Sequence, residues 1–447
     1  MASRDTVQKK PKDTKKTLRR LLSYMGRYRW LLALLFILCF TGNVLALFGP
    51  DLAGSAINAV AGGAGRVDFD RVFYYAERML FCYVASSLIT ITINIIMMYV
   101  SKWIARRMRK DVFDKLMRLP VGYFDQNQAG DIISRVSYDI DVVSTCLATD
   151  VVQIMTSIVT VAGSFAMMIY IAPSLAVVVL ITVPVAVVYT THMRRITQPR
   201  FSKRSRNYGI MNGFVEEMFS GQKTILAYAY ENRVAEKFDG INHDAADAYY
   251  DADYYGVSIG PTVGFINNTG LCLIAVFGSF LYMRGTILLG QISSFVLYSR
   301  KFSGPINEIA NIMNELYSAL AAAERVFTLL DEEEEPADSE NVAELTDVKG
   351  NVELQEVSFG YVKGKTIIHG LNFRAEAGGL VAIVGPTGAG KTTIINLLMR
   401  FYDVDAGRIL VEGEDIRTYT RRSLRGAYAM VLQDTWVFQG TVFDNIA

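Results

Sequence analysis

The sequence predicts an all-α membrane domain of six transmembrane helices with long cytoplasmic helical extensions, followed by a smaller α/β domain built around a phosphate-binding loop. Of the 447 residues, 51% are hydrophobic and only 20% are charged, and the mean hydropathy is +0.24. Soluble domains carry about 25% charged residues, so an entirely soluble chain does not fit. Apolar runs recur over the first two thirds of the chain, and a glycine-rich loop with a lysine follows near residue 385.

Six apolar runs predict the membrane-spanning helices. Except for the shorter fourth and sixth runs, they reach the length of about 20 residues that a helix needs to cross a bilayer. The sixth is short because Arg300 follows it, and we expect it to continue as an amphipathic helix through Leu320. The runs are residues 30–48, 79–100, 151–171, 175–189, 257–283 and 287–297.

Basic residues predict the orientation of these helices. Residues 1–29 contain ten Lys and Arg against two acidic residues, whereas the short links after the third and fifth runs carry at most Arg284. Because Lys and Arg collect on the cytoplasmic side, both termini are expected there. The formal net charge is only +1, so we expect no nucleic-acid partner. Because the basic segment 1–29 directly precedes the first span, we expect it to lie on anionic membrane lipid.

Two long polar loops, residues 101–146 and 193–256, are expected to form paired helices that extend beyond the membrane. Proline or glycine near the middle of each predicts a turn, and the turns fall near residues 120–131 and 226–233. Such turns can be a docking surface or simply solvated loops, and periodicity does not choose between them. The membrane domain is assigned to residues 30–325, and an acidic, solvated linker to residues 326–350.

The phosphate-binding loop lies in the last predicted domain, residues 351–447. Its short strands lead to an apolar run, residues 380–384, which is expected to form a buried parallel strand. The loop that follows matches GxxxxGK[ST] and precedes an apolar helix. Its backbone N–H groups and the helix N-terminus can bind phosphates, while the lysine reaches the β- and γ-phosphates and the first threonine holds Mg²⁺. The expected nucleotide contacts are Gly385, Pro386, Thr387, Gly388, Ala389, Gly390, Lys391, Thr392 and Thr393, with Thr392 also a metal ligand.

Six spans, long cytoplasmic helix pairs, an acidic linker and this loop together resemble one half of an ATP-binding cassette (ABC) exporter. Tyr361 matches the family's aromatic residue that stacks on adenine. Gln433 matches the glutamine that contacts Mg²⁺ and the attacking water, and is therefore a second expected metal ligand. Residues 122–135 resemble the family's first coupling loop, and residues 438–446 resemble the stretch that receives the coupling loops.

The resemblance implies an ATP-driven exporter half-subunit that uses ATP and Mg²⁺ and works by alternating access with a second half-transporter, as a homodimer or a heterodimer. Its substrate would be hydrophobic or amphipathic, such as a drug, a lipid or a peptide. Its location would be the plasma membrane, which is the inner membrane in a bacterium. We expect Phe124→Ala in the first coupling turn to uncouple ATP turnover from transport.

The nucleotide-binding domain is expected to be incomplete in this chain. The family's LSGGQ signature, catalytic glutamate and switch histidine do not occur after Gln433. We therefore expect no catalytic residue here: the 447-residue chain would not hydrolyse ATP, whereas its complete parent would be an ABC-type ATPase. ATPase activity of this chain that Lys391→Ala abolishes would contradict that expectation.

Two other interpretations stay open: a non-catalytic membrane protein whose truncated cassette only binds nucleotide or a partner subunit, and a nucleotide-gated channel. Polar residues within the spans are candidates either for substrate contact or for bridging between helices. They are Asn43, Thr90, Thr92, Asn94, Tyr99, Asn267 and Asn268. The four cysteines and three histidines have no metal-ligand spacing.

Overall fold

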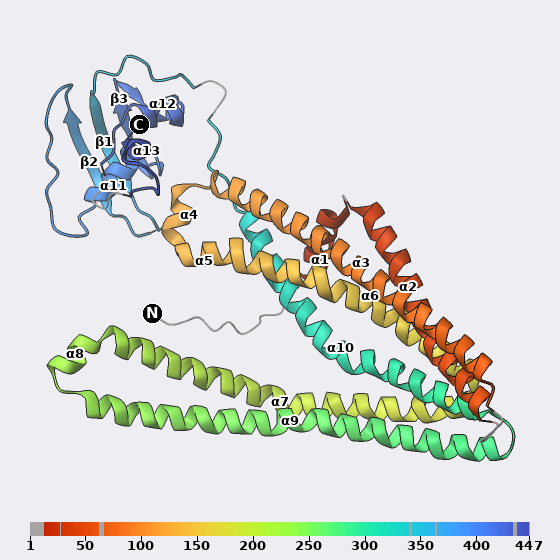
Figure 1. Cartoon of the computed structure of the whole chain (residues 1–447). Coiled ribbons are helices and arrows are strands. Elements are labelled where there is room, and N and C mark those ends of the chain that lie inside the picture. Colours follow the sequence, from red (N-terminus) through yellow and green to blue (C-terminus); the bar gives the residue numbers. More distant parts are fainter. Residues whose placement is uncertain are drawn as a thin grey trace. The chain divides into compact units, whose positions relative to one another are not determined.

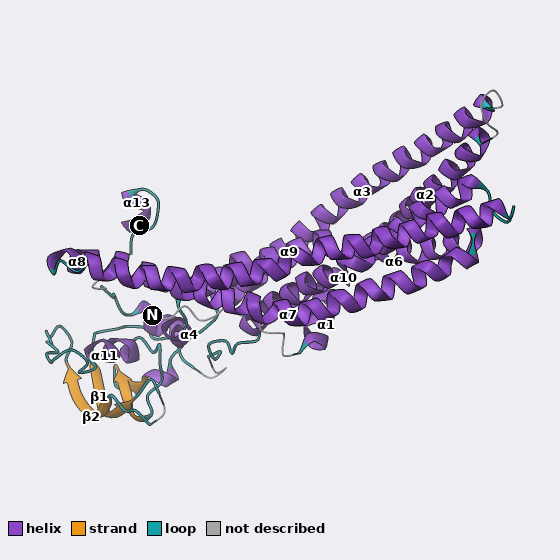
Figure 2. Cartoon of the chain, turned by 90° about the horizontal axis from the view of Figure 1, so that it is seen from below, coloured by secondary structure: helices purple, strands orange, loops and turns teal. Residues whose placement is uncertain are grey.

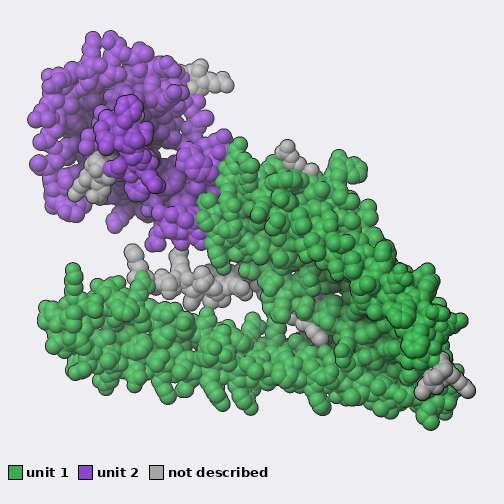
Figure 3. Space-filling model, viewed as in Figure 1, with its two compact units in different colours: residues 1–110, 135–328 green, residues 111–134, 329–447 purple. Residues whose placement is uncertain are grey.

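The computed structural model describes residues 13–26, 28–61, 67–338, 342–362, 364–431 and 436–446. The chain forms two compact units, which Figure 3 shows in different colours. Unit 1 comprises Met1–Lys110 and Arg135–Thr328, and unit 2 comprises Asp111–Ser134 and Leu329–Ala447. Described strands lie only in unit 2, whereas long helices dominate unit 1 (Figure 2). Residues 111–134, in the long loop between the second and third spans, therefore belong to the same compact unit as the C-terminal domain.

Long helices build unit 1 (Figure 1). The elements are α1 (Thr14–Gly26), α2 (Arg29–Val60), α3 (Phe69–Leu116, which continues into unit 2), the π-helical turn η1 (Arg135–Asp139), α6 (Ile140–Ile171), α7 (Pro173–Ser220), α8 (Gln222–Ala227), α9 (Glu231–Met283) and α10 (Leu289–Leu330). α7 and α9 lie side by side and are joined through α8. Pro173 can begin α7 because the first helical residue needs no N–H partner.

Five helical segments, not six, are long and apolar enough to cross a membrane among the described residues. They are α2, α3, the stretch Ala129–Ile171, α7 and α9. The sixth run lies in α10, where Arg300 and Lys301 interrupt the apolar sequence after Ser299. The expectation of a sixth span by apolar length is therefore not met, although α10 is a single continuous helix.

α10 is nevertheless an interior helix of unit 1. Phe295 and Tyr298 are fully buried in a cluster with Met168 of α6 and Ile274 of α9. The Tyr298 hydroxyl donates a hydrogen bond to the Leu47 carbonyl of α2 at 2.5 Å. A helix that packs on three others needs less lipid-facing apolar surface, which explains how α10 tolerates its charged residues.

Unit 2 is organised around a small antiparallel sheet with strand order β2–β1–β3–β4. Its core joins Leu354 of β1 and Ile409 of β3 to Leu397 of α11 and Leu424 of α12. Its elements are α4 (Val121–Gln126), α5 (Ala129–Ser134), β1 (Val352–Phe359), β2 (Ile368–Ala375), α11 (Lys391–Leu398), β3 (Ala406–Val411), β4 (Glu414–Asp415), the 3₁₀ turn η2 (Ile416–Thr418), α12 (Arg421–Gly426) and α13 (Val442–Ile446).

The strand expected at residues 380–384 is not formed. These residues carry no regular secondary structure, and Leu380 and Val384 are almost completely exposed. A strand needs a neighbour that accepts and donates its backbone hydrogen bonds. Among the described residues no strand pairs with this run, since the sheet contains only β1 to β4. The expectation of a buried strand here was wrong for that reason.

The acidic run at residues 331–336 is not simply solvated. α10 extends to Leu330, so the helix continues past residue 325. Glu334 pairs with Lys115 at 3.1 Å, and Glu335 pairs with Arg425 of α12 at 2.5 Å. The backbone N–H of Glu335 also donates to the Arg118 carbonyl. These partners lie far away in the sequence, so charge composition alone misassigned the run as free linker.

Candidate functional site

The glycine-rich loop turns sharply before α11. Gly388 and Gly390 have φ values of +87° and +84°, a backbone conformation that glycine adopts without strain. Gly390 caps the N-terminus of α11, and its carbonyl accepts the first helical hydrogen bond, from Ile394. A Cβ added at Gly390 would approach Ile368 to 3.3 Å, so the close packing of β2 also favours glycine there.

The loop encloses the Lys391 ammonium group. Lys391 Nζ donates hydrogen bonds to the carbonyls of Gly385 and Pro386, each at 2.8 Å. Residues 385–389 are exposed, and so is Thr392. Thr393, in the first turn of α11, is buried. The first backbone N–H groups of a helix have no helical acceptor, so this exposed turn presents donors and a cation together. That combination suits an anion such as a phosphate group.

Tyr361 lies beside α11, close to the loop. Its hydroxyl accepts a hydrogen bond from Asn396 Nδ2 at 3.0 Å and lies 3.4 Å from Thr393 Oγ1. Its ring contacts Phe359 and Tyr402 edge-on, with centroid distances of 5.1 Å and 4.9 Å. The structure therefore brings Tyr361 and the loop residues together, and 37% of Tyr361 remains exposed.

Tyr402 connects α4 to the C-terminal domain inside unit 2. The Tyr402 hydroxyl donates to Asp125 Oδ2 of α4 at 2.5 Å, and its ring lies against Gly122. Burial, together with the hydrogen bond to the Asp125 carboxylate, raises the pKa of Tyr402. Sequence reasoning selected the segment around Asp125 but missed Tyr402. Its only sequence signal is its place four residues after α11, in Phe401-Tyr402-Asp403.

The remaining expected residues do not complete a metal site in the described structure. Gln433 lies outside the described residues, so Thr392 is the one expected metal ligand whose position is known. Within the described ranges, no three His, Cys, Asp or Glu side chains gather in a way that could hold a metal ion. In the second long polar loop, α8 precedes the turn at residues 228–230, where Ala229 has φ +52°.

The polar residues of the spans divide into two groups. Asn43 bridges helices, since its Oδ1 accepts from Thr160 of α6 at 2.9 Å and its Nδ2 donates to the Cys39 carbonyl. Thr90 and Thr92 each donate to a carbonyl four residues earlier in α3. Asn267 and Asn268 of α9 instead line a cavity of about 170 Å³, together with Leu271, Ser299, Arg300, Ser303 and Gly304. Asn267 and Asn268 therefore face a space that a ligand can enter.

Comparison with known proteins is consistent with both units. A family model described as the ABC transporter transmembrane region matches residues 32–306, and one described as ABC transporter matches residues 368–446. An uncharacterized ABC transporter ATP-binding protein of Bacillus subtilis is 38% identical over 98% of this chain and 72% of its own length.

Two further relatives have more specific names. The fatty acid ABC transporter ATP-binding/permease protein of Mycobacterium bovis is 40% identical over 88% of this chain and 62% of its own length. The ATP-dependent lipid A-core flippase of Photorhabdus laumondii is 29% identical over 78% of this chain and 60% of its own length. The chain thus spans between 60% and 72% of the length of these relatives.

Proposed function

Because the chain belongs to the ABC transporter family, as a multi-pass membrane domain followed by an ATP-binding domain, we propose that it is part of an ATP-driven exporter of amphipathic, lipid-like molecules. The single observation that carries the nucleotide part is the exposed glycine-rich turn that encloses the Lys391 ammonium group at the N-terminus of α11. In this proposal the loop backbone and Lys391 hold the ATP phosphates. Thr392 and Gln433 hold Mg²⁺, and Tyr361 stacks on adenine.

The nucleotide proposal is tested by titrating the purified 447-residue chain with a fluorescent ATP analogue and Mg²⁺. Lys391→Ala should weaken binding by about 10- to 100-fold, because a charge-assisted hydrogen bond contributes about 1.5–3 kcal/mol. Lys365→Ala is the matched control, since Lys365 is an exposed cation near the β1–β2 turn. Equal affinity of the wild type and Lys391→Ala would refute the nucleotide site.

The substrate proposal is supported by the cavity between α9 and α10. Arg300 lies there with the amides of Asn267 and Asn268, while Leu271 adds an apolar wall. A guanidinium group binds carboxylate and phosphate through two parallel hydrogen bonds. The named relatives handle a fatty acid and a lipid A-core, which are both amphipathic molecules. We therefore assign the cavity to the anionic headgroup of an amphipathic substrate.

Binding of a fluorescent fatty acid to the detergent-solubilised chain tests this assignment. Arg300→Gln should weaken binding by about tenfold or more, because it removes a charged donor from the cavity. Arg284→Gln is the control, since Arg284 is exposed just after α9 and does not line the cavity. If both variants lose the same affinity, the cavity is not the headgroup site.

The dimeric mechanism and the orientation complete the proposal. We place both termini in the cytoplasm because the Lys- and Arg-rich segments flank the same ends of the spans. The membrane would be the plasma membrane. A second half-transporter would supply the opposing nucleotide domain, so that ATP binding and hydrolysis drive alternating access. Cross-linking that depends on ATP between chains carrying single engineered cysteines in the nucleotide domain would test the dimer.

A further inference from the structure

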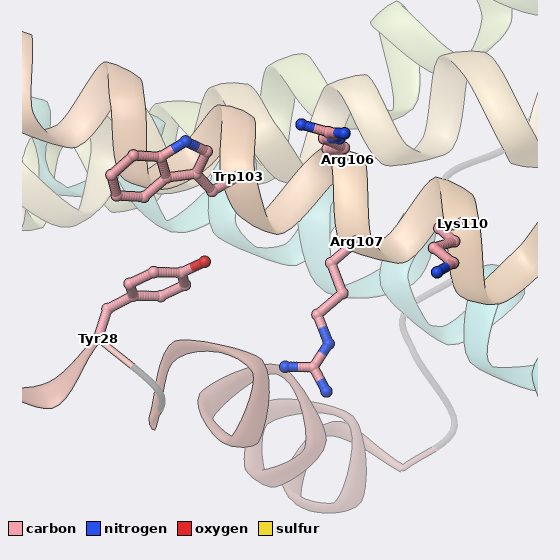
Figure 4. A pocket seen from close by; sticks show the side chains of 5 residues that line it. All are labelled: Tyr28, Trp103, Arg106, Arg107 and Lys110. Atoms are coloured by element: carbon pink, nitrogen blue, oxygen red, sulfur yellow. The ribbon is translucent and has the colours of Figure 1, made fainter.

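An open cleft of about 620 Å³ lies between Tyr28, just before α2, and one face of α3 (Figure 4). Its α3 residues recur at the spacing i, i+3, i+4 and i+7, which places them on one stripe of the helix. The opposite face of α3, including Ile104 and Met108, is buried inside unit 1. The complete lining is Tyr28, Trp103, Arg106, Arg107 and Lys110. The cleft therefore lies on the exposed side of α3, opposite the side that packs into unit 1.

One end of the cleft is aromatic. The Tyr28 and Trp103 rings are stacked with centroids 5.6 Å apart and an interplanar angle of 23°, and Figure 4 shows the two rings facing each other. The ring centroid of Tyr99, one turn earlier in α3, lies 6.4 Å from that of Trp103. Trp103 is 48% exposed despite these contacts. Tryptophan and tyrosine concentrate at the headgroup level of a bilayer, so this end suits the boundary between acyl chain and headgroup.

The other end of the cleft is cationic. Arg106, Arg107 and Lys110 follow Trp103 within about 10 Å along the helix axis, at ~1.5 Å per residue. Arg107 extends from α3 toward α1, where its guanidinium lies 5.6 Å from the Tyr24 ring centroid (Figure 4). The side chains that line the cleft carry three positive charges and no carboxylate. This end therefore attracts an anion, and the order from aromatic to cationic matches that of a phospholipid.

We propose that this cleft binds the phosphate headgroup of an anionic membrane phospholipid, with the Tyr28–Trp103 pair against its glycerol and first acyl carbons. A phospholipid headgroup and free phosphate would present the same anionic group to the cationic end of the cleft. The aromatic end continues the apolar part of α3, and this favours a lipid over free phosphate. The site is separate from the substrate cavity, which is lined by α9 and α10. A lipid there would contact both α3 and Tyr28, which lies between α1 and α2. Its binding requires neither nucleotide nor transport substrate.

Trp103 lines the cleft and can report on a bound lipid through its fluorescence. The chain has three tryptophans, so only two others need to be replaced. Trp30→Phe and Trp436→Phe leave Trp103 as the single tryptophan, which is excited selectively over the tyrosines. This chain is placed in phosphatidylcholine nanodiscs that contain increasing fractions of brominated phosphatidylglycerol or brominated phosphatidylcholine. We expect the anionic lipid to quench Trp103 at a lower mole fraction than the zwitterionic lipid.

Charge-removing variants then test the cationic end. Arg106→Gln with Lys110→Gln should reduce the preference for phosphatidylglycerol by about 30-fold, because each cation near an anionic bilayer contributes about a fivefold preference. Lys203→Gln with Arg206→Gln removes the same charge from exposed positions of α7 without altering the cleft lining and should retain the preference. Arg106→Lys with Lys110→Arg should also retain it, which separates loss of charge from loss of structure.

Three results would overturn the proposal. Equal quenching by both lipids in the parent chain would show that the cleft does not select an anionic headgroup. A preference that survives in the Arg106→Gln, Lys110→Gln variant would place the lipid elsewhere. Displacement of brominated phosphatidylglycerol by inorganic phosphate would show that the ligand is a soluble phosphate. Because the readout uses lipid alone, these outcomes are independent of the nucleotide and substrate tests.

Discussion

An ion pair between η1 and α10, with a buried carboxylate and a half-exposed guanidinium, gives the sharpest stability prediction for this chain. Arg325 Nε donates to Asp139 Oδ2 at 2.9 Å, and Arg325 Nη2 donates to Oδ1 at 2.5 Å. The Asp139 side chain is only 3% exposed, whereas the Arg325 side chain is 51% exposed. Its hydrogen bonds to Asp139 raise the pKa of Arg325. We therefore expect the two possible single substitutions to have very different costs.

The asymmetry in burial determines the magnitudes. Arg325→Leu leaves the Asp139 carboxylate buried without its counter-ion, which costs about 3–5 kcal/mol. Asp139→Asn leaves a guanidinium that water can reach, so its cost is closer to the ~1–2 kcal/mol of lost hydrogen bonding. In the double variant no buried charge remains. We therefore expect the double variant to be more stable than Arg325→Leu alone, with a coupling of up to about 3 kcal/mol.

Hydrogen exchange of the amides near Asp139 reads the local stability of this region. Arg325→Leu should accelerate exchange in the first turns of α6 by about a thousandfold, the equivalent of ~4 kcal/mol. Arg206→Leu, at an exposed cation of α7, is the control and should change little. The reasoning would be refuted if Asp139→Asn costs as much as Arg325→Leu, or if the double variant is the least stable of the three.

Three other predictions concern separate contacts. Tyr402→Phe should lower the free energy of unfolding of unit 2 by about 1 kcal/mol, because one solvent-accessible hydrogen bond is lost. In Asp125→Asn the amide oxygen can still accept that bond, so the thermal midpoint of this variant should fall less than that of Tyr402→Phe. The side chain of Asn351 and nearby backbone N–H groups donate to Glu412 and lower its pKa to about 2. Its stabilisation is thus present above the unfolded pKa of ~4.3 and lost as the pH falls toward 2. The protection factors of the amides at residues 349–351, which remove the change of the intrinsic exchange rate with pH, should fall in the wild type between about pH 5 and pH 3. Glu412→Gln should show low protection factors at both pH values, and equal protection of the variant and the wild type at neutral pH would contradict this. Gly290→Ala should destabilise unit 1 by about 1–3 kcal/mol, because the new Cβ would overlap the carbonyl of Gly54. Gly304→Ala is the control: its new Cβ meets no atom within 4 Å, so the thermal midpoint should stay equal or rise.

The local features of this protein were predictable from the sequence. The apolar runs, the β1 and β2 strands and the glycine-rich loop each depend on residues that are neighbours in the chain. The loop at Gly388 and Gly390 is an example, because the backbone conformation follows from glycine itself and from the helix that starts at Lys391. The spacing of Trp103 and Lys110 on one stripe of α3 is equally visible in the sequence.

Partners from distant segments were decided by the tertiary structure alone. Asp139 and Arg325 are 186 residues apart, and Asp125 and Tyr402 are 277 apart, so no periodicity connects them. Apolar composition suggested a strand at residues 380–384, but a strand forms only where another strand lies beside it. Charge composition suggested a solvated linker, but the fold brought Arg425 to Glu335. The sequence determined what each segment can do by itself, and the packing of separate segments determined which of those possibilities are used.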